Sequence, residues 1–99
     1  MKIELKNVKF CEWASQETNC FSAIVYADGE PIFTVENDGR GGADIHRACE
    51  GHDGQTFREN VKKVEKLIEG KKFRVGEMEF DYDLDVFIGD FFVDWLNAA

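Results

Sequence analysis

The stretch CFSAIVYADGEPIFTVEND, residues 20–38, decides the fold that the sequence predicts. Apolar and β-branched residues run on both sides of Asp28-Gly29, and an Asp-Gly pair between two such runs is typical of a tight β-hairpin turn. We therefore predict strands at about 20–27 and 31–36. Pro31 is compatible with this prediction because it falls at the start of the second strand, where a proline is tolerated.

Residues 3–10, N-terminal to this hairpin, predict a further strand. Its apolar residues are Ile3, Leu5, Val8 and Phe10. The alternation between apolar and polar residues changes parity at Lys6-Asn7, and such a change indicates a β-bulge. Residues 72–81 alternate again, with Phe73 and Val75 before Gly76 and two further apolar residues after it, and predict a fourth strand.

Two amphipathic helices are predicted C-terminal to the hairpin. Thr56 and Glu59 fit a capping box before a helix at 57–69, and Gly70 would end it. Asp83 stands at the N-cap of a second helix at 84–97, whose apolar residues recur at intervals of three and four. These residues are Leu84, Phe87, Ile88, Phe91, Phe92, Trp95 and Leu96.

The element order β-β-β-loop-α-β-α indicates an α+β fold. We expect an antiparallel β-sheet of three to four strands with two helices packed on one face. The length of 99 residues suits one core, so residues 1–99 are predicted to form a single domain.

Composition and charge exclude several classes of protein. Residues 1–6 lack the apolar region of a signal peptide, and no apolar run approaches the about 20 residues of a membrane span. Three cysteines in such a chain are expected to be reduced thiols in a cytoplasm. The net charge of −8 disfavours nucleic acid and anionic membranes as direct partners.

The charge is concentrated in the last quarter of the chain. Residues 75–99 hold seven acids and no Lys or Arg, whereas residues 1–74 hold thirteen acids and all twelve Lys and Arg. Solvated faces of a strand and a helix would explain each acid singly. Alternatively, the acids form a surface for a basic partner groove, because carboxylates on one strand face recur about every 6.6–6.8 Å, close to the phosphate spacing of nucleic acid. The candidate partner-binding residues are Glu77, Glu79, Asp81, Asp83, Asp90 and Asp94.

Residues 37–55 form a long glycine-rich connection, and such connections often have a function. The candidates for a ligand site in it are Asn37, Asp38, Arg40 and Asp44. The weak candidates for metal ligands are His46, Cys49 and His52, whose spacing matches no common zinc finger. The alternative is a polar loop with ordinary histidines and a buried thiol. We therefore expect no metal and no cofactor.

Two further patterns have a simpler interpretation. Residues 37–42, NDGRGG, resemble a phosphate-binding loop, but they lack a Gly-Lys-Ser/Thr ending, so a tight turn is the favoured interpretation. A cysteine with a histidine could act as nucleophile and base, but no orienting acid or oxyanion hole stands at recognisable spacing, so we expect no enzyme. Cys11 and Cys20 are expected to face each other across a strand pair, either as reduced core residues or as a disulfide.

The pattern S-x-E-T-x-C-F-x-A at residues 15–23, followed by Asp28-Gly29 and by N-D-G-x-G-G at residues 37–42, resembles small uncharacterised proteins of bacteriophages and bacterial genomes. The C-terminal helix, with its Val93-Asp94-Trp95-Leu96 end, is similar to theirs. A histidine often stands in these proteins where this chain has Arg40. The resemblance implies a bacterial host cytoplasm, with phage infection as a possible setting, and no established activity.

These observations favour a small acidic, non-enzymatic protein-binding module. We expect a phage-encoded inhibitor, anti-CRISPR-like or blocking another host or defence factor, that binds a basic groove through an acidic surface that mimics nucleic acid. It would be a monomer or a dimer. The alternative function is a ligand- or metal-binding domain that uses the 37–55 loop.

Overall fold

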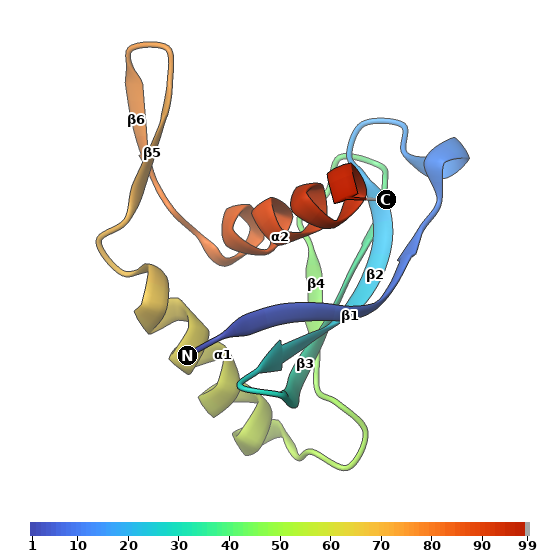
Figure 1. Ribbon diagram of the computed structural model, residues 1–99, viewed down its shortest axis with the longest axis vertical. Helices are drawn as coiled ribbons and strands as arrows, with labels where there is room; N and C mark the ends of the chain where they lie inside the picture. The colour runs from blue at the N-terminus through green and yellow to red at the C-terminus, as the bar shows by residue number, and fades with distance from the viewer. Residues whose placement is uncertain (99) are drawn as a thin grey trace. The chain divides into compact units, whose positions relative to one another are not determined.

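The computed structural model describes residues 1–98 and has an α+β fold (Figure 1). It contains a four-stranded antiparallel sheet, a two-stranded sheet and two helices, so the predicted fold class is confirmed. The chain forms two compact units, Met1–Asn60 and a second that starts at Val61. Neither helix, through residue 98, has the length and apolar content needed to cross a membrane.

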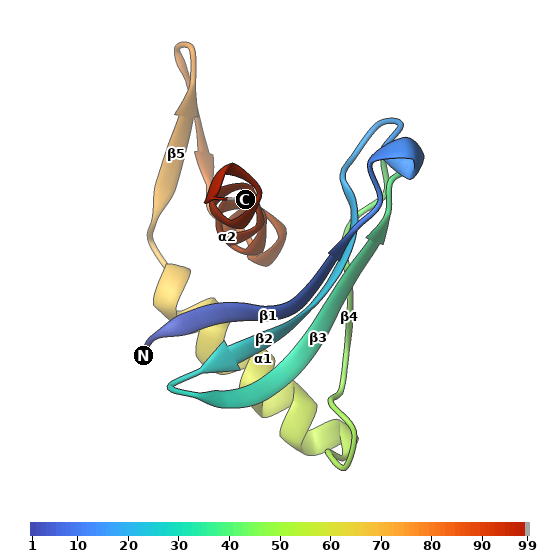
Figure 2. The same cartoon turned by 45° about the vertical axis from the view of Figure 1, so that its right-hand side comes forward.

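The first unit contains the four-stranded sheet, which is strongly twisted (Figure 2). Its strands lie in the order β1 (Ile3–Phe10), β2 (Cys20–Ala27), β3 (Glu30–Asp38) and β4 (Ile45–Arg47), each antiparallel to its neighbour. The predicted hairpin is confirmed: Ala27 pairs with Glu30, and the turn residues Asp28 and Gly29 have φ of 51° and 85°. Positive φ at both central residues is what a type I′ turn requires, and Asp-Gly supplies it at low cost.

The bulge predicted in the first strand is also confirmed. The register between β1 and β2 shifts between Lys6 and Lys9, and Asn7 has a positive φ of 52°. Asparagine is one of the few residues that adopt this left-handed conformation readily. The bulge therefore follows from the residue type as well as from the change of parity.

The segment predicted as a long connection, 37–55, is more ordered than expected. β3 continues to Asp38, β4 forms at Ile45–Arg47, and α1 (Gly54–Ile68) begins within the segment. A short 3₁₀ helix, η1 (Glu12–Ala14), also lies between β1 and β2. β4 and η1 escaped the sequence patterns because each has three residues, too few to show a period.

The core of the first unit lies on one face of the sheet. Alternate residues of β2 and β3 are buried there: Phe21, Ala23, Val25, Phe33 and Val35. The first two turns of α1 cover this face. The ring of Phe57 meets that of Phe33 edge-on at 6.4 Å between centroids, and the side-chain amide of Asn60 donates to the carbonyl of Ile32 at 3.0 Å. The buried amide of Asn60 is thus hydrogen-bonded.

The predicted capping box of α1 is wrong. Asp53 is the N-cap, because the backbone N–H of Thr56 donates to Asp53 Oδ1 at 2.7 Å, and the helix begins three residues earlier than predicted. Hydrogen bonds from Thr56 stabilise the carboxylate of Asp53 and therefore lower its pKa. The predicted end of the helix is confirmed: Gly70 has φ of 79°, and the N–H of Lys71 donates to the carbonyl of Ile68 at 3.0 Å.

In the second unit, the single strand predicted at 72–81 is a hairpin instead. β5 (Lys72–Val75) and β6 (Met78–Asp81) pair antiparallel, and Gly76-Glu77 forms the turn between them. Gly76 has φ of 62°, which glycine adopts without steric cost. The change of parity at Gly76 therefore marks a reversal of the chain. The two-stranded β5–β6 sheet is separate from the four-stranded sheet.

The C-terminal helix α2 (Leu84–Ala98) begins where the sequence predicts. The N–H of Val86 donates to Asp83 Oδ1 at 2.8 Å, so Asp83 is the N-cap. Ile88 and Phe92 of the apolar stripe are fully buried, but Trp95 remains 37% exposed and stacks on Phe92. The packing of α2 on the four-stranded sheet stays a prediction.

Candidate functional site

The segments that carry the S-x-E-T and N-D-G-x-G-G patterns meet in the first unit. Residues 15–18 and 37–42 form a hydrogen-bonded structure that we call the clasp. The backbone N–H groups of Gln16, Glu17 and Thr18 all point to the carbonyl of Gly39, at 3.1, 3.0 and 3.4 Å. The clasp joins the connection between β1 and β2 to the end of β3, two segments about twenty residues apart in the chain.

Asn37 is the centre of the clasp and is buried. Its Oδ1 accepts from the hydroxyl of Thr18 at 2.7 Å and from the N–H of Gly39 at 2.9 Å. Its Nδ2 donates to the carbonyl of Gly42 at 2.9 Å and to Asp44 Oδ1 at 3.0 Å. The amide of Asn37 is saturated by these four bonds, so its role in the structure is to hold the loop.

Two glycines of the clasp have positive φ, which residues other than glycine rarely adopt. Gly39 has φ of 82°, and a Cβ there would collide with the carbonyl oxygen of Ala14 in η1. Gly41 has φ of 90°, and a Cβ there would collide with the carboxylate of Glu17. The backbone therefore explains Gly39 and Gly41 of the N-D-G-x-G-G pattern, whereas a Cβ at Gly42 would meet open space. Beside Ala14, the side chain of Trp13 is 87% exposed.

The backbone N–H groups of the clasp that could bind a phosphate already have acceptors within the chain. The N–H groups of Gly39, Arg40 and Gly41 donate to Asn37 Oδ1, Asp38 Oδ1 and Thr18 Oγ1, at 2.9, 3.1 and 3.3 Å. A phosphate-binding loop needs such N–H groups free to face the anion. The structure therefore agrees with the tight turn that the sequence favoured, and Arg40 and Asp38 lie exposed on its surface.

Ser15 explains another position of the pattern. Cys11 donates its N–H to the carbonyl of Cys20 at 2.9 Å, but the return bond of the strand pair is replaced by the Ser15 hydroxyl. This hydroxyl donates to the carbonyl of Cys11 at 2.8 Å and accepts from the N–H of Cys20 at 2.9 Å. Cys11 and Cys20 do face each other as predicted, and both are free thiols.

The three weak candidates for metal ligands are not assembled into one site. His46 lies in β4 and its ring meets that of Phe33 edge-on at 5.7 Å. Cys49 is buried, and desolvation raises the pKa of its thiol, which disfavours the thiolate that a metal needs. Throughout residues 1–98, neither Cys49 nor His52 joins His46 in a group of three potential ligands.

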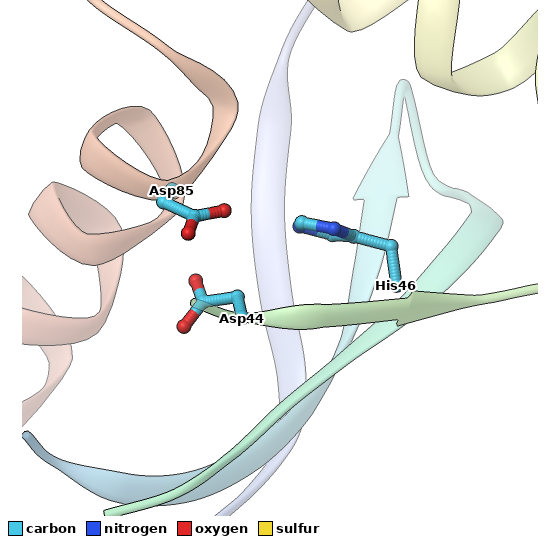
Figure 3. Close-up of side chains that lie close together, drawn as sticks. All are labelled: Asp44, His46 and Asp85. Carbon is cyan, nitrogen blue, oxygen red and sulfur yellow. The ribbon is translucent and has the colours of Figure 1, made fainter. Parts of the chain in front are cut away.

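Asp44 and His46 do approach each other. They are two residues apart at β4, and their side chains point to the same side of the strand (Figure 3). Their ligand atoms lie within 4.8 Å. Two ligands from one strand fall short of the four that a structural zinc site uses. Asp85, also drawn in Figure 3, belongs to the first turn of α2 in the second unit.

The acids of the β5–β6 hairpin are opposed by bases that the charge count of residues 75–99 missed. Arg74 pairs with Glu79 and Lys72 with Asp81, with nitrogen–oxygen distances of 4.0 and 3.9 Å. Glu77 lies in the turn, so Glu77, Glu79 and Asp81 do not form the continuous row on one strand that phosphate-like spacing requires. The reversal of the chain at Gly76 places the bases of β5 opposite these acids and separates Glu77 from the acids of β6.

The acids of α2 lie beside aromatic side chains. Asp90 and Asp94 are one helical turn apart, and the Tyr82 hydroxyl donates to Asp90 Oδ2 at 2.8 Å. These residues line a pocket of about 210 Å³, which we call the α2 pocket. Its lining consists of Lys71, Tyr82, Phe87, Asp90, Phe91 and Asp94. The sequence predicted Asp90 and Asp94 as partner-binding residues but assigned Phe87 and Phe91 to the core.

Asp90 also changes the acidity of Tyr82. The hydrogen bond to the carboxylate, with a smaller contribution from desolvation, raises the pKa of the Tyr82 hydroxyl above its ordinary value of 10.0. The Tyr82 hydroxyl holds Asp90 in place by donating this hydrogen bond. No sequence pattern pointed to Tyr82, because the contact joins the end of the hairpin to the second turn of α2.

Comparison with protein-family models, with curated proteins and with solved structures gives no match. The function is therefore argued from the residues of the chain.

Proposed function

We propose that the chain is a non-enzymatic protein-binding module that binds a basic surface of a partner through the acidic residues of its second unit. The observation that carries this proposal is the α2 pocket, which combines two carboxylates and three aromatic rings with one cation, Lys71, so that its charge is negative. Carboxylates attract a guanidinium or an ammonium group, and aromatic faces add cation–π attraction. The pocket therefore has the chemistry to take an Arg or Lys side chain.

Several carboxylates of this unit are available to such a partner. Among residues 61–98, no Lys or Arg nitrogen lies within ion-pair distance of Glu77, Asp83, Asp90 or Asp94. Glu79 and Asp81 have only the long, exposed pairs with Arg74 and Lys72, and exposed pairs of this kind contribute little to stability. A partner cation can therefore replace the internal ones at low cost.

The charge distribution supports the same class of partner. Seven acids and no base in residues 75–99 give this part of the chain a negative field that attracts basic surfaces and repels nucleic acid. Electrostatic attraction of this kind accelerates association and excludes partners of like charge. The proposed partner is a host or defence protein with a basic groove, as expected of an anti-CRISPR-like inhibitor in a bacterial cytoplasm.

The proposal is tested with the double variant Asp90→Asn/Asp94→Asn and a control that removes the same charge elsewhere. Glu30→Gln/Glu50→Gln is the control, because both residues are exposed in the first unit. Binding of an octa-arginine peptide is measured by calorimetry, and pull-downs from bacterial lysate are compared for the same three proteins. We expect the α2 variant to weaken peptide binding about tenfold, which is ~1.4 kcal/mol, and the control about twofold or less.

Proteins captured by the native chain and the control should also be lost from the α2 variant. Equal losses in the two variants would mean that binding follows net charge alone, and the α2 pocket would then have no role. No binding of the peptide to the native chain would overturn the proposal as a whole.

A further inference from the structure

The β5–β6 hairpin presents an apolar face that the chain leaves largely open. Phe73 and Val75 of β5 pair with Phe80 and Met78 of β6, so these four side chains share one face. Val75 and Met78 are each 63% exposed and Phe80 is 40% exposed. Phe73 is the least exposed of the four, because its ring stacks on Phe80 and contacts Tyr82.

The hairpin also has unpaired backbone edges. The two-stranded sheet has no third strand among residues 61–98. It extends away from the helices of its own unit in both views (Figures 1 and 2). Isolated two-stranded hairpins are at best marginally stable, and an open edge accepts a further strand. The combination of an open edge and an exposed apolar face is what a strand-adding partner needs.

The register shows which backbone groups face outward. The N–H of Tyr82 donates inward to the carbonyl of Lys71, and hydrogen-bonded pairs alternate along an antiparallel ladder. The pairs Phe73–Phe80 and Val75–Met78 are therefore the bonded ones. It follows that Glu79 and Asp81 direct their N–H and C=O groups outward from β6, whereas Lys72 and Arg74 direct theirs outward from β5.

Charge selects between these two edges. A strand added to β6 would lie beside the carboxylates of Glu79 and Asp81 on one face and beside Met78 and Phe80 on the other. It should therefore alternate basic and apolar residues. A strand added to β5 would need acids opposite Lys72 and Arg74, and the chain's net charge of −8 repels an acidic segment.

A second copy of the chain is a poor occupant of the β6 edge. Two β6 strands related by a two-fold axis would place Glu79 and Asp81 against the same acids of the other copy. Like charges directly opposite each other in a strand pair are destabilising. The acids of β6 therefore disfavour pairing with itself and favour a basic strand.

We infer that β6 is the docking edge for an extended segment of the partner in which basic and apolar residues alternate, added as a third strand. This inference rests on the proposed function and specifies how the partner binds. Main-chain hydrogen bonds form at Glu79 and Asp81, basic side chains lie over these carboxylates, and apolar side chains cover Met78 and Phe80.

The test uses the peptide acetyl-Arg-Val-Arg-Val-Arg-Val-amide and amide hydrogen exchange followed by NMR. At saturating peptide, the outward amides of Glu79 and Asp81 should exchange about tenfold more slowly or better, as new hydrogen bonds require. The outward amides of Lys72 and Arg74 on the other edge should change less than about twofold. Protection on β5 instead, or no protection at either edge despite saturation, would overturn the inference.

Two variants of Glu79 distinguish the contribution of its backbone hydrogen bond to peptide binding from that of its carboxylate. Glu79→Gln removes the carboxylate, and Glu79→Pro removes in addition the outward N–H while leaving the inner ladder intact. We expect Glu79→Pro to bind the peptide at least about fivefold more weakly than Glu79→Gln, since a hydrogen bond is worth on the order of 1 kcal/mol. Exchange protection of the inward amides of Phe80 and Tyr82 verifies that the hairpin persists, and equal affinity of the two variants would contradict strand addition.

The two proposals fail in distinguishable ways. If octa-arginine does not bind the native chain, the proposed basic-partner function is overturned. If octa-arginine binds and the alternating Arg-Val peptide does not, only the docking edge is overturned. If the Arg-Val peptide binds, loses affinity in Asp90→Asn/Asp94→Asn and leaves Glu79 and Asp81 unprotected, the proposed function stands and the docking edge is overturned.

Discussion

The two β-hairpins of this chain have turns of the same length but opposite environments. The β2–β3 hairpin turns at Asp28-Gly29, has a further strand on each side and buries the central residues of one face, including Val25 and Phe33. The β5–β6 hairpin turns at Gly76-Glu77 and has no further strand in its own unit. The comparison shows that alternating residues specify a strand and its two faces, but do not specify what covers the apolar face.

The difference has an energetic consequence. Full burial of a large apolar side chain contributes about 1.5–3 kcal/mol to folding. The first hairpin gains this stabilisation within the chain. The second leaves Val75 and Met78 exposed, so the same free energy remains available for binding a partner.

The largest expected effect is a difference in the free energy of unfolding between a substitution in the first hairpin and one in the second. Phe33→Ala should destabilise the protein by about 3–5 kcal/mol, because Phe33 is fully buried and its loss leaves a cavity. Phe80→Ala should cost less than about 1 kcal/mol, since exposed apolar side chains contribute little. Urea unfolding followed by circular dichroism measures both. Similar costs for the two variants would show that the second hairpin is as well packed as the first.

A smaller effect compares the glycines that follow β3 and β5. Gly39→Ala should destabilise by about 2 kcal/mol or more, because φ is 82° and the new Cβ would collide with Ala14. Gly76→Ala should cost about 1 kcal/mol, because φ is 62° but the surrounding space is open. Thermal unfolding midpoints provide the measurement. If Gly39→Ala is no more destabilising than Gly76→Ala, the clasp is not rigid and its hydrogen bonds do not hold the end of the first hairpin.

The smallest expected effect is a change in the pKa of Tyr82, which lies at the base of the β5–β6 hairpin. In a Tyr26→Phe background, phenolate absorbance should report a pKa of Tyr82 above 10.0, and Asp90→Asn should bring it back toward that value. Because the folded-state pKa is raised, the Tyr82–Asp90 hydrogen bond stabilises the fold fully below pH 10.0, and this contribution is lost as the pH rises through the folded-state pKa. An unchanged titration in Asp90→Asn would place the carboxylate away from Tyr82.

Local rules in the sequence determined much of the fold. Asp28-Gly29 specified the first hairpin because few residue pairs accept a positive φ at both positions. Asp83 specified the start of α2, and Gly70 the end of α1, because unpaired backbone groups at helix ends require such residues. The same local chemistry located the bulge at Asn7. The acids of α2 were also found as candidates, because charge is a property of the residue and needs no fold to be counted.

Tertiary structure decided what depends on residues far apart in the chain. Thr18 meets Asn37 and Gly39 only when β2 and β3 bring their segments together, so the clasp could not be foreseen from either segment. Lys72 and Arg74 offset Glu79 and Asp81 only because the chain reverses at Gly76. Tyr82 completes the α2 pocket for a similar reason. Periodicity describes which side of an element a residue occupies, whereas contacts across a turn or between strands depend on register, and register is set when the elements pair.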